Sequence, residues 1–227
     1  MGGVPTVVIG RAESTAAKAS TRWVITLLHE HFHQLQYSQP RYYAEVDALG
    51  LARGDRTGMW MLNYAFPYAT PEVKDQFSAM GKALAEALKA RQQADFAREL
   101  AAYLEAKKKF RSLLRRDDYK YFAFQVWQEG IARYTEYHLA ELAAAEYEPS
   151  KAFRELKDYT PYKGEARAIL QGVQKELASV QLEKAKRTAF YALGAAEGLL
   201  LDRANPGWRR QYFKERFSLD RHFRSEK

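Results

Sequence analysis

The sequence predicts a mainly α-helical protein, and three observations support this fold class. Apolar residues recur at helical spacing over most of the chain, Pro and Gly separate long Ala-, Leu- and Lys-rich stretches, and only one short stretch is β-branched. The chain has 227 residues, of which 47% are hydrophobic, so it can bury a sizeable core. We expect one domain over residues 1–227, with at most a small N-terminal β element, and we leave open that its N-terminus is truncated.

The N-terminal part of the chain predicts one strand, one helix and one loop. Val4–Ile9 is short, rich in β-branched residues and flanked by glycines, which is typical of a strand. Helical spacing of apolar residues begins at Ser14 or Thr15 and ends near Tyr37. Residues 38–70 are rich in Gly, Pro and aromatic side chains. They predict a long loop that serves either as a substrate-binding wall or as packing.

From residue 70 onward the sequence predicts helices with short breaks. Thr70 as N-cap and Pro71 at the first helical position start a stretch of two helices. Asp117 or Asp118 is expected to cap the next helix, which runs to about Tyr147. The remaining predicted features are, in order, a loop with Pro161 and Gly164, helical sequence from Glu165 to about Arg203 with a break near Lys186, and a turn at Asn205-Pro206-Gly207.

The charge and the cysteine count restrict the chemistry of the chain. It carries a net charge of +8 and has no cysteine. Disulfides and cysteine-based zinc sites are therefore excluded, and any metal must be bound by His and carboxylate side chains. The basic excess gathers in Lys107–Lys109, Arg115–Arg116 and Arg209–Lys227. These basic residues either form a solvated helical surface or attract nucleic acid, anionic surfaces or acidic peptides.

The sequence predicts no membrane-spanning segment. No apolar run approaches the roughly 20 residues that cross a bilayer, and the first residues lack the pattern of a signal peptide. The compartment stays open, and a secreted or periplasmic location is compatible with removal of an upstream signal.

A short motif in the first predicted helix carries the chemistry. His29, Glu30 and His33 form the pattern H-E-x-x-H, and helical residues four apart lie on one face about one turn apart. The two imidazoles can therefore bind one Zn²⁺ ion, and Glu30 lies beside them to take a proton from a metal-bound water. His31 points to the opposite side, so we expect it to be packed or at the rim.

A zinc site of this type needs a third protein ligand and keeps a fourth position for water. Glu129 is the best candidate, because it lies on a predicted helix on which Glu129, Arg133 and Glu136 share one face. The same pattern is also typical of an exposed, ion-paired helix face. The alternatives for the third ligand are Glu45, Asp47, His138 and His222.

These two segments resemble the gluzincin metallopeptidases, most closely the M1-type aminopeptidases. That family pairs HExxH with a downstream helix that reads N-E-G-x-A-x-Y-x-E, and this chain has Glu129-Gly130, Ala132, Tyr134 and Glu136 at the matching positions. The resemblance implies a zincin-like catalytic helical domain with Glu129 as the third zinc ligand. It also implies that Glu136 orients a ligating histidine by accepting its other ring N–H.

A third segment, Tyr191-Ala192-Leu193-Gly194, resembles the family's Y-x-x-G segment, and it starts 62 positions after Glu129 (191 − 129). The resemblance implies that Tyr191 stabilises the oxyanion of the reaction. The chain departs from the family in two respects. Glu129 follows His33 by 96 positions (129 − 33), a longer gap than in the family, and residues 1–28 lack its G-x-M-E-N segment. Endo- or exopeptidase action therefore stays open.

We expect a zinc-dependent metallopeptidase that hydrolyses peptide bonds through a water activated by Glu30, with a peptide or protein as substrate. One alternative is a basic α-helical module that binds nucleic acid or protein, although the sequence lacks a recognised nucleic-acid reading motif. Another is a zincin-derived domain that binds metal without activity. The oligomeric state stays open.

Overall fold

The computed structural model describes residues 6–223, and within that range the chain is helical and forms no strand. The mainly α-helical prediction is therefore confirmed. The longer helices are α1 (Ser20–Tyr37), α4 (Pro71–Lys89), α5 (Gln93–Ser112), α6 (Arg116–Gln125), α7 (Ile131–Glu146), α9 (Tyr162–Ser179) and α11 (Ala189–Ala204). Short helices are α2 (Tyr42–Asp47), α3 (Trp60–Asn63), α8 (Lys151–Arg154) and α10 (Leu182–Ala185).

Several single turns connect these helices. A π-helical turn, η2 (Val126–Gly130), joins α6 to α7 without interrupting the helical path. The 3₁₀ turns are η1 (Ala12–Ser14), η3 (Lys186–Thr188), η4 (Trp208–Arg210) and η5 (Asp220–Phe223).

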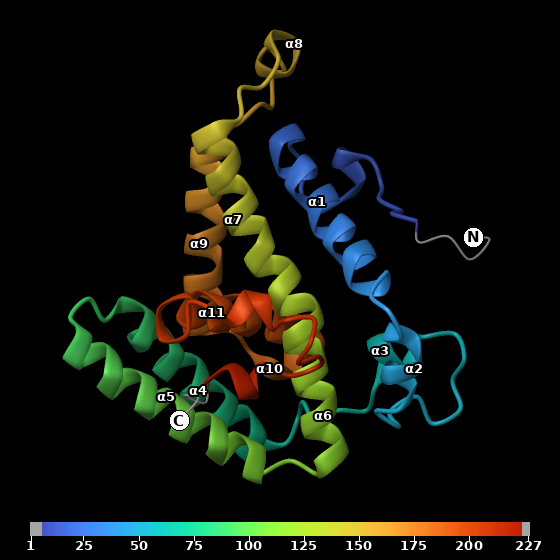
Figure 1. The fold of residues 1–227 in the computed structure, drawn as a ribbon, viewed down its shortest axis with the longest axis vertical. Coiled ribbons are helices and arrows are strands. Elements are labelled where there is room, and N and C mark those ends of the chain that lie inside the picture. The colour runs from blue at the N-terminus through green and yellow to red at the C-terminus, as the bar shows by residue number, and fades with distance from the viewer. Residues whose placement is uncertain (1–5, 224–227) are drawn as a thin grey trace.

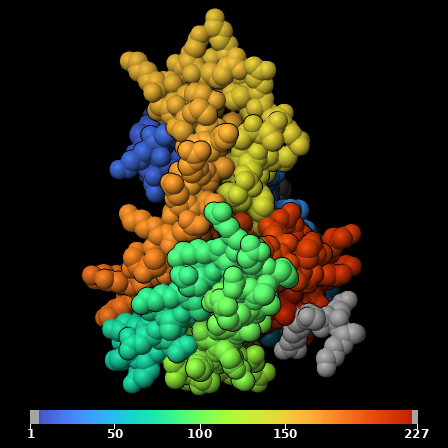
Figure 2. Space-filling view, turned by 90° about the vertical axis from the view of Figure 1, so that its left-hand side faces the viewer, coloured from blue at the N-terminus to red at the C-terminus, as the bar shows by residue number. Residues whose placement is uncertain are grey.

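The helices form a broad base and a narrower upper part (Figure 1). The pair α4 and α5 lies in the base with α11 and α6, while α7, α9 and α1 extend upward and α8 lies at the far end. The α7 helix packs against both α1 and α9, and α11 packs against η2 and α7. Figure 2 shows the same outline from the side, with α4 and α5 forming the lower face. Within residues 6–223 no helix combines the length and apolar character that crossing a membrane requires.

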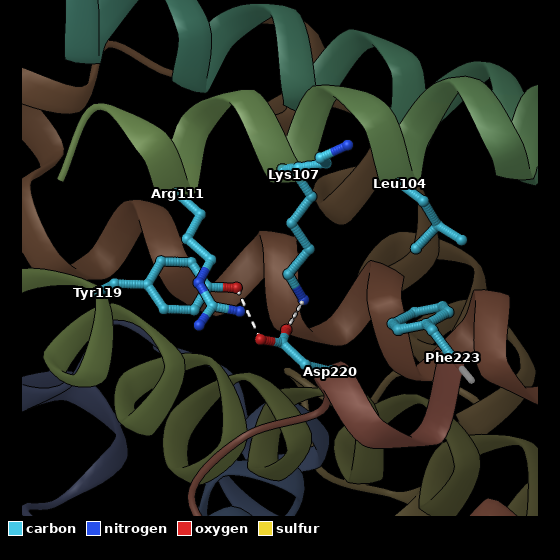
Figure 3. A pocket seen from close by; sticks show the side chains of 7 residues that line it. Leu104, Lys107, Arg111, Tyr119, Asp220 and Phe223 are labelled. Carbon is cyan, nitrogen blue, oxygen red and sulfur yellow. Dashed lines mark hydrogen bonds and ion pairs between the residues drawn. The ribbon is translucent and has the colours of Figure 1, made fainter. Parts of the chain in front are cut away.

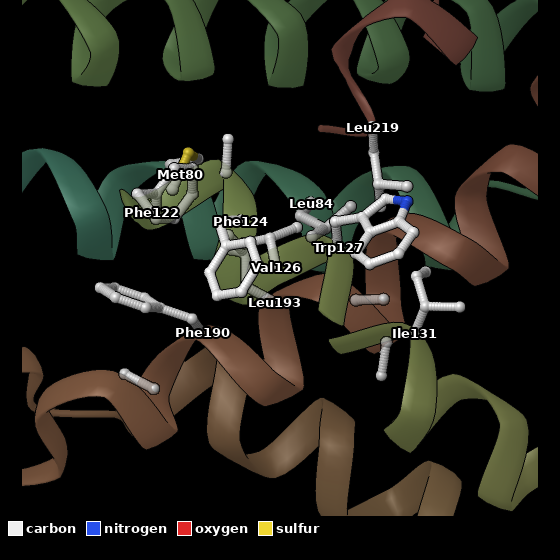
Figure 4. Close-up of a cluster of buried hydrophobic side chains, with 14 of the residues drawn as sticks. Met80, Leu84, Phe122, Phe124, Val126, Trp127, Ile131, Phe190, Leu193 and Leu219 are labelled. Atoms are coloured by element: carbon white, nitrogen blue, oxygen red, sulfur yellow. The ribbon is translucent and has the colours of Figure 1, made fainter. Parts of the chain in front are cut away.

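The main hydrophobic core lies in the base, where aromatic side chains dominate. Figure 4 shows part of this cluster, with Phe122, Phe124 and Trp127 from the α6–η2 segment near Phe190 and Leu193 from α11. A second, smaller cluster lies where α1, α7 and α9 meet, and it contains Ile25, Ala140, Tyr162, Ala166 and Ile169. This smaller cluster fixes α1 against α7, which positions the H-E-x-x-H face of α1.

The N-terminal elements differ from the prediction. Thr6–Ile9 forms no strand, and Val4 and Pro5 lie outside the described residues. A single short strand is not stable without a partner strand, and the described chain has none to offer. Helix α1 begins at Ser20, not at Ser14 or Thr15, because Lys18 takes a positive φ of 54° that interrupts helical backbone.

Other boundaries confirm or correct the sequence prediction. The start of α4 at Pro71 after Thr70 and the turn after Asn205 are confirmed. Residues 38–70 are less irregular than predicted, because they contain α2 and α3. Two predicted details are wrong: α6 begins at Arg116 without an Asp cap, because the carboxylate of Asp118 binds Tyr64 and Arg115, and Gly164 lies within α9.

Candidate metal centre

The side chains of His29, His33 and Glu129 converge between α1 and η2 and form a group that could hold a metal ion. The Nε2 atoms of the two histidines are 3.1 Å apart. Oε2 of Glu129 lies 3.4 Å from Nε2 of His33 and 3.8 Å from Nε2 of His29. Both histidines are buried and the Glu129 side chain is 17% exposed, so the centre lies just below the surface.

The hydrogen-bond network fixes the tautomer of His33. The side-chain Nε2 of Gln36 donates to the backbone carbonyl of Gln128 (3.0 Å), which can only accept. The carbonyl oxygen Oε1 of Gln36 must therefore face His33, whose Nδ1 lies 2.7 Å away. Nδ1 of His33 is consequently the N–H donor, and its Nε2 directs a lone pair at His29 and Glu129.

The same reasoning applies to His29. Its Nδ1 lies 2.9 Å from Oε1 of Glu136, and the other oxygen of that carboxylate accepts a bond of 2.7 Å from Arg22. An ionised carboxylate only accepts, so Nδ1 of His29 carries the proton and its Nε2 faces the centre. Arg22 holds Glu136 in place, so that Glu136 can fix the orientation of the His29 ring.

In the absence of a metal ion, a proton on His29 offsets the repulsion between the hydrogen-bond acceptors that meet in the centre. Burial lowers the pKa of His29, but hydrogen bonds and charges from Glu129 and Glu136 outweigh burial and raise the pKa to about 9. Burial raises the pKa of Glu129, whereas the two histidines more than offset it and lower the pKa far below its usual value. The centre therefore attracts positive charge, either a proton or a metal cation.

The π-helical turn and a close crossing of two helices position Glu129. The extra residue in η2 widens the helix there, a feature that often lies at functional sites. Gly130 follows Glu129 directly and contacts Gly194 of α11 so closely that a Cβ at Gly130 would lie 2.5 Å from the Gly194 Cα. Only glycine fits at this crossing, which brings α11 and Tyr191 next to the Glu129 turn.

Tyr191 lies beside the centre, and Glu30 is the residue after His29. The Tyr191 hydroxyl lies near the Glu129 carboxylate, and burial together with the Glu129 charge raises the pKa of Tyr191 well above its usual value. Glu30 is half-buried, and within residues 6–223 its carboxylate has no hydrogen bond or ion pair. The charge of Glu30 reaches Tyr37, because burial first and then Glu129 and Glu30 raise the pKa of the Tyr37 hydroxyl.

The other ligand candidates lie outside this group of three. Glu45 pairs with Arg216 at 3.0 Å, and Asp47 is exposed. His138 binds Asp202 at 3.1 Å, and the buried His222 packs near Trp208. His31 is exposed at the rim.

Sequence reasoning missed four residues around the centre: Arg22, Gln36, Tyr37 and Arg187. Tyr37 lies one turn after His33, and its ring stacks on the His33 ring with centroids 6.0 Å apart. The i, i+4, i+8 spacing of His29, His33 and Tyr37 on one helix face was a signal that could have identified Tyr37. The partners of the other three lie too far along the chain, or in too irregular a segment, for a pattern to indicate them.

The chain matches no protein-family model, no curated protein and no solved structure. The function must therefore be argued from the geometry of this centre.

Proposed function

We propose that the protein is a zinc-dependent metallopeptidase whose centre is His29, Glu30, His33 and Glu129. One observation carries the proposal: the Nε2 atoms of two histidines and one carboxylate oxygen converge on a common position, and Glu30, the residue after His29, has no hydrogen bond or ion pair in the described part of the chain. Such an arrangement is costly to bury unless a cation occupies it.

The ligand set and its dimensions suit zinc. Tetrahedral zinc with bonds of about 2.0–2.1 Å separates its ligand atoms by about 3.3 Å. The three separations in this centre are 3.1, 3.4 and 3.8 Å, so small adjustments would complete the first three positions. Two histidines and one carboxylate are also a ligand set of catalytic zinc sites, which keep a fourth position open.

The protein side chains would divide the work of hydrolysis. A bound zinc ion would supply Lewis acidity at the scissile carbonyl and would acidify a water molecule. Glu30 would accept the proton of the attacking water and pass it to the leaving amine. The Tyr191 hydroxyl would donate a hydrogen bond to the oxygen on which negative charge develops. Arg22 would hold Glu136 in position, and Gln36 would hold the His33 ring in position.

The test of the proposal is a Glu30→Gln variant, compared with wild type for metal content and for hydrolysis of casein. We expect both proteins to bind about one zinc ion per chain, while the variant loses hydrolysis by a factor on the order of 10²–10⁴ because it lacks the general base. Full activity of the variant would reject Glu30 as the base. A wild type that binds zinc but cleaves no peptide would instead support the alternative of an inactive zincin-derived domain.

A Glu136→Gln variant is expected to weaken zinc binding by about 10–100-fold, because the His29 ring loses its charged partner. The measurement is a competition titration with a chelator of known affinity. Glu146 lies on the same helix and is exposed, so Glu146→Gln is the matched control and should leave the affinity unchanged. Equal affinities of the two variants would contradict the orienting role of Glu136.

A further inference from the structure

Arg187 lies at the border of the proposed centre, in the turn η3 that precedes α11. It is one helical turn before Tyr191, and it donates a hydrogen bond to the Tyr191 hydroxyl, which lies close enough to Glu129 to feel its charge. The Arg187 guanidinium is therefore held at the hydroxyl that lies beside the proposed metal-ligating carboxylate.

The guanidinium of Arg187 has no acidic partner. Within residues 6–223 no carboxylate lies within ion-pair distance of it, and its other N–H groups have no hydrogen-bond acceptor. Its neighbours are tyrosines: its Cζ lies 5.6 Å from the Tyr191 ring centre, and its charge reaches the hydroxyls of Tyr68 and Tyr121. Other half-buried arginines of this chain, such as Arg133 and Arg216, bind a carboxylate.

The backbone next to Arg187 is strained. Lys186 has a φ of 49° and a ψ of −132°, a combination that only glycine adopts readily. The strain costs free energy that the surrounding contacts must offset, and it directs the chain so that Arg187 faces Tyr191. A partly buried cation held this way, without a counter-ion of its own, is suited to bind an anionic group from outside the chain.

We infer that Arg187 binds a carboxylate of the peptide substrate close to the scissile bond. This inference rests on the proposed function, because it places the peptide at Tyr191. One extended residue spans about 3.3–3.6 Å, so a group next to the Tyr191 hydroxyl belongs to the scissile bond's neighbouring residues. The carboxylate is either an acidic side chain at that position or the free C-terminus of the peptide, and both present the same planar pair of oxygens to the guanidinium fork.

The experiment starts from cleavage sites mapped by mass spectrometry in a casein digest. Peptides are then made in matched pairs, with Glu or Gln beside the cleaved bond, and with a free or an amidated C-terminus one residue after it. We expect wild type to prefer one acidic member by a factor on the order of 10–100 in kcat/KM, as a charge-assisted hydrogen bond provides. In Arg187→Gln this ratio should fall to about one.

Arg167 on α9 is exposed and pairs with no carboxylate in the described range, so Arg167→Gln is the matched control and should keep the wild-type ratio. Arg187→Lys keeps the charge without the fork and should give an intermediate ratio. The side-chain pair and the terminus pair distinguish the two sources of the carboxylate. Thermal unfolding of each variant verifies that it is folded.

A second readout separates this inference from the proposed function. The same peptide pairs are titrated by calorimetry into Glu30→Gln protein with and without Arg187→Gln, so that binding is measured without turnover. Loss of the acidic preference with Arg187→Gln supports the inference in both assays. An equal ratio with and without Arg187→Gln, while hydrolysis persists, overturns the inference alone. A wild type that cleaves no peptide overturns the proposed function and, with it, this inference, which is a different outcome from the loss of the inference alone.

Discussion

A Gly194→Ala variant is expected to lose about 3 kcal/mol of unfolding free energy and most of its metal affinity. A Cβ at Gly194 would lie 2.6 Å from both the Gly130 Cα and the Val126 carbonyl oxygen. Both contacts are with backbone, which cannot move aside as a flexible side chain can, so α11 and η2 must separate. Separation also displaces the turn that carries Glu129. Thermal unfolding and a zinc titration measure the two effects.

The size of the thermal effect follows from the length of the chain. A loss of about 3 kcal/mol lowers the Tm of a protein of this size by about 6–12 °C. Gly172 provides the control, because it lies within α9 and its added Cβ would meet nothing closer than 3.8 Å. Gly172→Ala should stabilise the protein by about 0.5–1 kcal/mol through helix propensity. Equal Tm values for the two variants would show that the crossing is not as tight as described.

A Lys107→Met variant is expected to lose about 3–5 kcal/mol, because it leaves the buried Glu197 and the half-buried Asp220 without their cation. Lys107 donates to Glu197 at 2.7 Å and to Asp220 at 2.8 Å, and Glu197 is fully buried. Figure 3 shows Lys107 and Tyr119 directed at Asp220, where a cavity of about 250 Å³ opens beside them. The measurement is chemical denaturation at neutral pH.

Lys109 is exposed on the same helix and has no ion pair in the described part of the chain, so Lys109→Met is the control. It should change stability by less than about 0.5 kcal/mol. A similar loss in both variants would contradict the role of the buried pair.

The loss caused by Lys107→Met should shrink in acid. Burial raises the pKa of Glu197, so this carboxyl is the first to take up a proton as the pH falls. Burial also opposes ionisation of Asp220, but the Lys107 charge and hydrogen bond outweigh burial and lower its pKa. A carboxyl group whose pKa is lower in the folded than in the unfolded protein stabilises the fold at any pH above its unfolded-state pKa. This stability is lost as the pH falls through the folded-state pKa. Denaturation at acid pH therefore measures a smaller difference between variant and wild type.

Local sequence patterns predicted the helices well, because several long helices carry their own apolar stripe. The stripes of α4 and α9 are complete within their own sequence, so a window of a few turns suffices to find them. Helix starts were harder, because caps can come from distant residues. The backbone N–H of Ser20 donates to Asp158, and no local signal at Ser20 indicates this. Likewise, no local signal indicates that the Asp118 carboxylate accepts a hydrogen bond from the distant Tyr64 hydroxyl instead of capping its own helix.

The centre was predictable only as far as its residues formed a compact motif or resembled a family. His29 and His33 lie four positions apart on one helix, with Glu30 between them, so the spacing alone places the two rings on a common face. Glu129 was the best candidate for the third ligand because of its place on a predicted helix face, and the family resemblance pointed to the same residue. Gln36 could not be assigned, because its function comes from a hydrogen bond to Gln128, 92 positions away. Arg187 could not be assigned either, because it lies in an irregular turn whose backbone no propensity predicts.

The order of the centre along the chain has a consequence during synthesis. His29 and His33 leave the ribosome early, Glu129 follows much later, and Tyr191 comes on the last long helix. The Gly130–Gly194 contact that brings the Glu129 turn and Tyr191 together cannot form until α11 has been made. An unfinished chain therefore has the histidine pair but not the completed site. The proposed hydrolytic activity would thus begin only after α11 has been synthesised, because the site depends on contacts between segments far apart in sequence.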